Sequence, residues 1–93
     1  MGGNRKITRE LEVRNRLGIH ARPAAMLVKT AANYESEITI THAENSVSAK
    51  SIMGVLTLEG YQGARFQLVV EGPDAEDAVA AVEELFANGF YED

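Results

Sequence analysis

Two different spacings of apolar residues alternate along this chain, and together they predict its secondary structure. In residues 65–71 apolar side chains recur at every second position, which is typical of a strand with one buried face. After Asp74, the expected N-cap, apolar residues recur at helical spacing until Gly89 ends the pattern. By the same criteria strands are predicted at 7–13, 37–41, 46–49 and 65–71, and further helices at 21–33 and 51–58. The predicted order is β-α-β-β-α-β-α.

This order of elements favours a two-layer α+β fold, because each predicted helix has a single apolar face that must be covered. The alternating strands imply a sheet with one face open to water. The first strand is the least regular, since Arg9 interrupts its alternation. With 93 residues, 45% of them hydrophobic, the chain has the size of one domain over 1–93 with a single core.

The composition excludes several classes of protein. The absence of cysteine rules out disulfides and thiolate metal sites, so the fold is expected to depend on core packing. No apolar run approaches the length of a membrane span, and no secretory segment follows Met1. We therefore expect a soluble cytoplasmic protein.

Charge is distributed unevenly along the chain, and this asymmetry constrains the partners. Residues 1–30 hold seven basic and two acidic side chains, whereas 31–93 hold two basic and twelve acidic ones, for a net charge of −5. The basic residues are dispersed and lack interleaved aromatic residues, which argues against nucleic-acid binding. Steering of an acidic protein partner or a phosphoryl group is the better use of this asymmetry.

The strongest candidate for chemistry is the motif 18–24, which places a histidine at the predicted start of a helix. Pro23 fits only the first helical turn, so His20 is expected at or beside the N-cap, where free N–H groups attract an anion. Arg22 carries a permanent charge in a planar fork that suits phosphate oxygens. A neutral imidazole is also a nucleophile near neutral pH. These properties suit a phosphoryl-carrying histidine, although by spacing alone an ordinary surface histidine is the commoner outcome.

The segments 15–25 and 49–58 resemble the two signature motifs of the phosphocarrier HPr family of the bacterial phosphotransferase system. The resemblance covers nearly the whole chain. It implies an open-faced two-layer β-sandwich, in which helices cover one face of a four-stranded antiparallel sheet. It also implies that His20 accepts a phosphoryl group on Nδ1 from enzyme I and passes it to EIIA domains.

The resemblance assigns further roles around this histidine. Arg22 would neutralise charge on the phosphoryl oxygens, and the backbone of Gly18, Ala21 and Arg22 would contact the phosphate. Gly18 serves equally well as a plain turn residue. No general base, metal ligand set or cofactor motif is evident, and His42 is expected to be an ordinary surface residue. The chain is therefore expected to be a phosphoryl carrier without a cofactor or metal, not a free-standing enzyme.

A second candidate site begins at Ser51, which is expected to cap a short helix. The resemblance implies that Ser51 is a regulatory phosphorylation site for an HPr kinase/phosphorylase, where that enzyme exists. Ile52, Met53 and Leu56 are expected to form an exposed apolar patch that docks partners, together with Lys29 on the first helix. A phosphate on Ser51 would add negative charge beside this patch.

Two other functions stay open at this point. The loop 15–18 and the ending 85–93 favour an NPr-type carrier of the nitrogen-related phosphotransferase system, whereas 51–54 favours HPr proper and carries more weight. A binding regulator that transfers no phosphate is disfavoured by the presence of His20. The protein is expected to act as a monomer without inserting into membranes.

Overall fold

The computed structural model describes residues 5–92, so residues 1–4 and 93, including the expectation made at Met1, lie outside it. The elements follow the predicted order. They are β1 (Arg5–Glu12), α1 (Ala21–Ala31), β2 (Glu37–His42), β3 (Asn45–Ser48), α2 (Ile52–Leu56), β4 (Arg65–Gly72) and α3 (Ala75–Ala87), followed by a single turn over Gly89–Tyr91.

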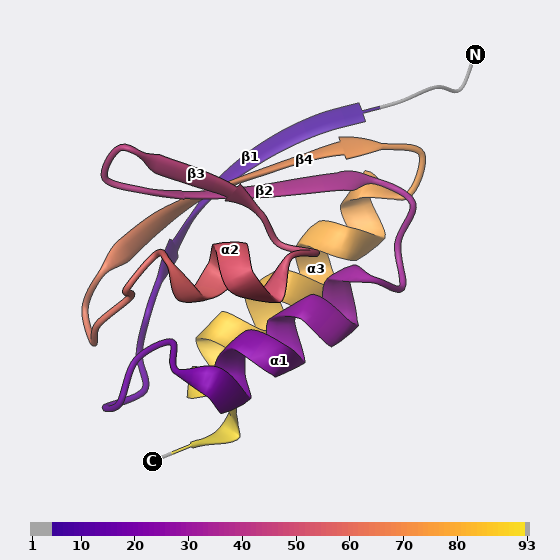
Figure 1. Ribbon diagram of the computed structural model, residues 1–93. Helices are drawn as coiled ribbons and strands as arrows, with labels where there is room; N and C mark the ends of the chain where they lie inside the picture. Colours follow the sequence, from indigo (N-terminus) through magenta and orange to yellow (C-terminus); the bar gives the residue numbers. More distant parts are fainter. Residues whose placement is uncertain (1–4, 93) are drawn as a thin grey trace.

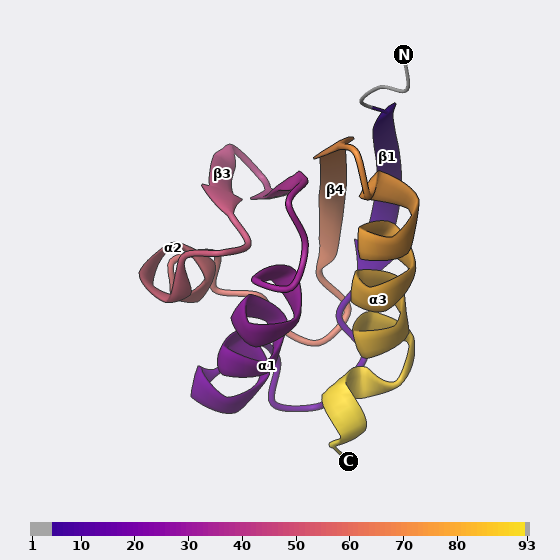
Figure 2. The same cartoon turned by 90° about the vertical axis from the view of Figure 1, so that its right-hand side faces the viewer.

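The four strands form one antiparallel sheet in the order β1-β4-β2-β3. The helices lie on one side of this sheet and leave the other side uncovered (Figures 1 and 2). The predicted open-faced two-layer α+β sandwich is therefore confirmed. The core lies between the two layers, where Phe66, Leu68 and Val70 of β4 are fully buried together with Leu27 of α1 and Val82 of α3.

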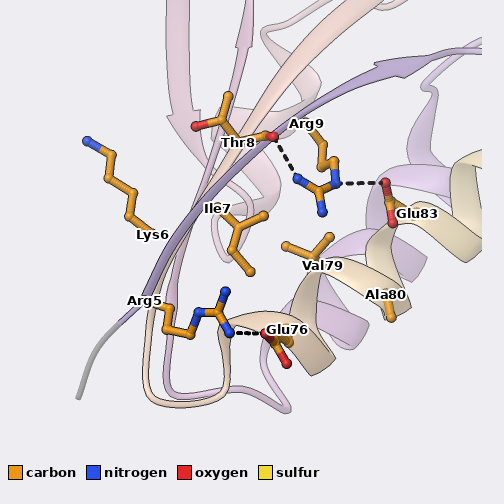
Figure 3. Close-up of a pocket in the computed structure, with 9 residues that line it drawn as sticks. All are labelled: Arg5, Lys6, Ile7, Thr8, Arg9, Glu76, Val79, Ala80 and Glu83. Carbon is orange, nitrogen blue, oxygen red and sulfur yellow. Dashed lines mark hydrogen bonds and ion pairs between the residues drawn. The ribbon is translucent and has the colours of Figure 1, made fainter. Parts of the chain in front are cut away.

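The first strand shows why Arg9 interrupts the apolar alternation. β1 is at the edge of the sheet, and Arg9 lies on its helix-facing side at the rim of the core. Its guanidinium donates to the carbonyl of Thr8 at 3.1 Å and pairs with Glu83 of α3 at 3.6 Å. Figure 3 shows this pair and the neighbouring Arg5–Glu76 pair, each of which joins β1 to α3 across the groove between them. A charged residue fits this position because it stays half exposed.

Asp74 precedes α3 as predicted, but its carboxylate does not cap that helix. It accepts hydrogen bonds from the Ser36 hydroxyl at 2.5 Å and from the N–H groups of Glu35 and Ser36 at 2.9 Å. The hydrogen bond from the Ser36 hydroxyl is the main reason that the pKa of Asp74 lies below its ordinary value. Asp74 thus joins the start of α3 to the loop between α1 and β2.

Two helices are shorter than predicted. α1 ends at Ala31, and α2 covers only Ile52–Leu56. The predicted cap on α2 is confirmed, since the Ser51 hydroxyl accepts a hydrogen bond from the N–H of Gly54 at 3.0 Å. None of the helices in residues 5–92 is long and apolar enough to cross a membrane.

Candidate functional site

His20 occupies the N-cap of α1, as the position of Pro23 predicted. Its backbone is extended (φ −98°, ψ −165°), and its carbonyl accepts the first helical hydrogen bond from Ala24 at 2.9 Å. Among residues 5–92 no acceptor faces the N–H groups of Ala21 and Arg22, the first two of the helix. The His20 side chain is 40% exposed. The imidazole and two unpaired donors therefore meet at an accessible helix start, which is a site that favours an anion.

The loop before His20 is held against the loop that follows α2. Ile19 donates its N–H to the carbonyl of Gly60 at 2.8 Å. Gly18 has a φ of +73°, and a Cβ at this position would lie 2.2 Å from the same carbonyl oxygen. Both observations require glycine there and give it a packing role. A contact between Gly18 and phosphate stays a prediction.

Glu92 lies at the predicted site, in contact with His20 and Arg22. The sequence analysis did not identify it as a candidate. Nε2 of His20 lies 3.1 Å from both carboxylate oxygens of Glu92. The same carboxylate accepts from Arg22 at 3.2 Å and from the Asn15 amide at 2.9 Å, and its side chain is only 14% exposed. Burial acts to raise the pKa of Glu92, but the hydrogen bonds from His20, Asn15 and Arg22 outweigh it and lower that pKa. Glu92 is therefore an ionised acceptor against the imidazole.

Asn15 supports this arrangement from below the surface. It is buried, and its amide nitrogen donates to the carbonyl of Gly18 at 2.7 Å as well as to Glu92. Its amide oxygen has no hydrogen-bond partner among the described residues. A buried amide in this position fixes the Glu92 carboxylate relative to the loop that carries His20.

The chain reaches this position through an unusual turn. Gly89, Phe90 and Tyr91 have φ values of 58°, 55° and 59°, which form one left-handed turn. Such a conformation costs about 1–2 kcal/mol for each non-glycine residue. Phe90 offsets this cost because it is fully buried and stacks edge-on against Phe86, with ring centroids 4.9 Å apart. The turn brings the end of the chain back to the start of α1.

The predicted docking residues fall into two groups. In α2, Ile52, Met53 and Leu56 are 39%, 70% and 37% exposed, so this helix presents apolar side chains to solvent. The helix itself lies beside α1 (Figures 1 and 2). Ser51 directly precedes it and is exposed. Lys29 lies in the last turn of α1, about 13 Å from His20 by helical rise. The structure therefore does not place Lys29 at the His20 end of the helix, and its role in docking stays a prediction.

The expectation that His42 is an ordinary surface residue is wrong. Its ring packs against Phe66 and Tyr61, with centroid distances of 5.1 and 5.6 Å, and it is partly buried. Its Nδ1 donates to the carbonyl of Leu58 at 2.9 Å. His42 therefore has a packing role next to the core.

The fold and the site together define a small open-faced α+β sandwich with an accessible histidine and an arginine at the start of its first helix. A model of the family described as "PTS HPr component phosphorylation site" matches residues 7–88. The chain therefore belongs to the HPr family of the phosphotransferase system, whose members are phosphocarrier proteins.

Individual relatives agree with this assignment. The chain is 44% identical to the phosphocarrier protein HPr of Treponema pallidum over 87 residues, which cover 94% of this chain and 99% of the relative. It is also 44% identical over 84 residues to HPr of Xylella fastidiosa, covering 90% and 94%. The crystal structure of a Thermoanaerobacter tengcongensis HPr superposes with a TM-score of 0.86 at 39% identity, covering 96% of this chain and 98% of that one.

Proposed function

We propose that this chain accepts a phosphoryl group on His20 from enzyme I of the sugar phosphotransferase system and passes it to EIIA domains. The observation that carries this proposal is the accessible His20 imidazole at the N-cap of α1, beside Arg22 and two unpaired backbone N–H groups. The protein would do so as a cytoplasmic monomer, with no cofactor or metal. It would act as a protein substrate and donor in the relay.

The chemistry needs an anion to be bound briefly and then released. Nδ1 of His20 would take the phosphoryl group, while Arg22 and the N–H groups of Ala21 and Arg22 would contact its oxygens. Interaction with the helix dipole contributes about 0.3–1 kcal/mol at an exposed site. This modest stabilisation suits a relay better than permanent storage of phosphate.

Incubation with phosphoenolpyruvate and enzyme I tests the proposal. We expect an adduct that is labile in acid and stable in base, and we expect His20→Ala to abolish it. His42→Gln replaces the only other histidine and serves as the matched control, which should retain the label. Labelling of the His20→Ala protein would contradict the assignment.

We further propose that Ser51 is a regulatory phosphorylation site for an HPr kinase/phosphorylase. Ser51 is exposed at the start of α2, directly before the apolar surface of Ile52, Met53 and Leu56. A phosphate there would add about −1.5 to −2 charges beside that surface. It would oppose docking of enzyme I and hence transfer through His20.

An NPr-type carrier of the nitrogen-related system is the second candidate. The sequence of the ending 85–93 favours it. Within that ending, the Glu92 carboxylate contacts the His20 imidazole. The segment 51–54 favours the sugar system. Transfer rates from phosphorylated protein to a sugar-specific EIIA and to a nitrogen-related EIIA decide between the two, and we expect the sugar-specific EIIA to be the faster acceptor.

A further inference from the structure

We propose that Glu92 is a positioning residue for His20, which holds a proton on Nε2 and leaves the Nδ1 lone pair free to take the phosphoryl group. This inference rests on the proposed function, because it explains how the imidazole is prepared for transfer. It concerns a residue beyond the part of the chain that matches the family, which ends at residue 88.

The contact itself determines which ring nitrogen carries the proton. An ionised carboxylate only accepts hydrogen bonds, so Nε2 of His20, at 3.1 Å from both oxygens of Glu92, must be the donor. In a neutral imidazole one nitrogen donates and the other accepts. Nδ1 therefore carries the lone pair. Among residues 5–92 no hydrogen bond engages Nδ1, so this lone pair is available to an incoming phosphorus atom.

The same contact serves the bond-forming step without any proton transfer. The Nδ1 lone pair forms a bond to the phosphorus of the donor's phosphohistidine, and the electron pair of the breaking N–P bond returns to the donor's ring nitrogen. The His20 ring then holds both the phosphoryl group and the Nε2 proton, and so gains a positive charge. The Glu92 carboxylate compensates that charge. In the onward step the ring leaves as neutral imidazole, which is a far better leaving group than an imidazolate.

The surrounding structure holds Glu92 in place for this purpose. The left-handed turn over Gly89–Tyr91 directs the chain back toward α1, and buried Phe90 anchors it. Asn15, itself buried, binds one carboxylate oxygen, while Arg22 binds the other. Backbone strain of this kind concentrates at functional sites, where the surrounding structure over-determines it. A carboxylate that only balanced surface charge would need neither the left-handed turn over Gly89–Tyr91 nor the hydrogen bond from the buried Asn15 amide.

Nitrogen-15 NMR of the unphosphorylated protein tests the positioning directly. The spectra are recorded at about pH 8.5, which lies above the reference pKa of histidine side chains. We expect the His20 shifts to show the proton on Nε2 in the native protein, and a population with the proton on Nδ1 in Glu92→Ala. The matched control is Glu44→Ala, which removes the same charge from the exposed turn between β2 and β3 and should leave the His20 signals unchanged. A proton on Nδ1 in the native protein, or identical spectra for the native and Glu92→Ala proteins, overturns the inference.

Phosphoryl acceptance from phosphorylated enzyme I supplies the second measurement. We expect Glu92→Ala and Glu92→Gln to lower kcat by about ten- to a hundredfold, the range expected for a hydrogen bond to a charged group, with KM for enzyme I changed less than twofold. A kcat within twofold of the native value in both variants overturns the inference. If the native protein accepts no phosphate while its NMR spectrum shows the Nε2 proton, the proposed function fails and the Glu92 contact stands.

Discussion

Arg22 has one partner in the resting site and would gain another during transfer. In the resting site its guanidinium lies 3.2 Å from Glu92, and its side chain is 58% exposed. Because the Arg22 side of this ion pair is exposed to water, the pair contributes little to stability. A phosphoryl group on His20 would bring more negative charge to the same helix start. The Arg22 guanidinium can therefore leave Glu92 and contact the phosphoryl group with little loss of folding stability.

Replacing Arg22 should affect transfer much more than folding. We expect Arg22→Ala to keep its thermal midpoint within a few degrees, since changes at exposed positions typically cost within about 0.5 kcal/mol. We expect phosphotransfer from enzyme I to slow by about a hundredfold, the usual effect of removing one donor to a developing anion. Arg16→Ala, at an exposed position of the preceding loop, is the matched control and should transfer normally. Normal kinetics or outright unfolding of Arg22→Ala would each contradict this role.

Signals from neighbouring residues were enough to predict that His20 lies at the start of α1, but they could not reveal Glu92. Pro23 and the apolar spacing after it fixed where α1 begins, so the position of His20 followed from neighbouring residues. Glu92 is 72 residues away from His20 and reaches it only through the left-handed turn at Gly89–Tyr91. Gly89 signals the end of the last helix, but nothing in the sequence indicates that Phe90 and Tyr91, which are not glycine, continue the left-handed turn. His42 was misjudged for a similar reason, because its ring partner Phe66 belongs to a distant strand.

At the scale of elements, α2 joins the proposed regulatory site to the proposed docking surface. It consists of only five residues and begins at the Ser51 cap. It lies beside α1 (Figure 1), and its exposed large side chains are the apolar Ile52, Met53 and Leu56. A charge added at Ser51 would therefore lie directly beside the proposed docking surface.

Ser51→Asp tests this connection. The variant should remain folded, because aspartate is as good an N-cap as serine. We expect KM for enzyme I to rise by about two- to fivefold, the effect of one exposed charge pair, with kcat nearly unchanged. Ser51→Ala should transfer normally while losing about 1 kcal/mol of stability with the cap. If Ser51→Asp behaves like the native protein in transfer and a cognate ATP-dependent kinase leaves Ser51 unmodified, the residue is only a cap.

The type of an element was easiest to predict where one face of a strand or helix is fully buried. It was harder to predict for the edge strand β1 and the short helix α2. The alternation in β4 is clear because its helix-facing side chains are fully buried. β1 has only one neighbouring strand, so it tolerates Arg9 on its helix-facing side, where Glu83 is within reach. α2 is too short for helical spacing to define its end. Its start was predictable because a serine cap is a local signal.

At the scale of the whole molecule, pairing between distant strands sets the architecture. β4 lies between β1 and β2, which come from opposite sides of α1 in the sequence. The spacing of apolar residues predicts which face of each strand is buried, but it carries no information on which strands are neighbours. The four-stranded antiparallel arrangement was therefore predicted from the family resemblance, and the order β1-β4-β2-β3 comes from the structure.

Asp74 connects distant parts of this architecture, so it should make the stability of the whole fold depend on pH. Hydrogen bonds from Ser36 and from the N–H of Glu35 lower the pKa of Asp74 in the folded state. A lowered pKa means that the folded state favours the ionised carboxylate. Its contribution is present above the pKa of the unfolded chain and is lost as the pH falls through the lowered value of the folded state.

We therefore expect the native protein to lose stability between about pH 5 and pH 2, and part of this loss to disappear in Asp74→Asn. At neutral pH Asp74→Asn should be less stable than the native protein, because an amide accepts the hydrogen bonds of Ser36 and Glu35 less strongly than a carboxylate does. Denaturant unfolding across this pH range measures both effects. Asp77→Asn removes the same charge from the first turn of α3, where its carboxylate accepts no hydrogen bond from the described residues, and should retain the native pH dependence. An Asp74→Asn protein with native stability at neutral pH would show that this link between α3 and the α1–β2 loop does not stabilise the fold.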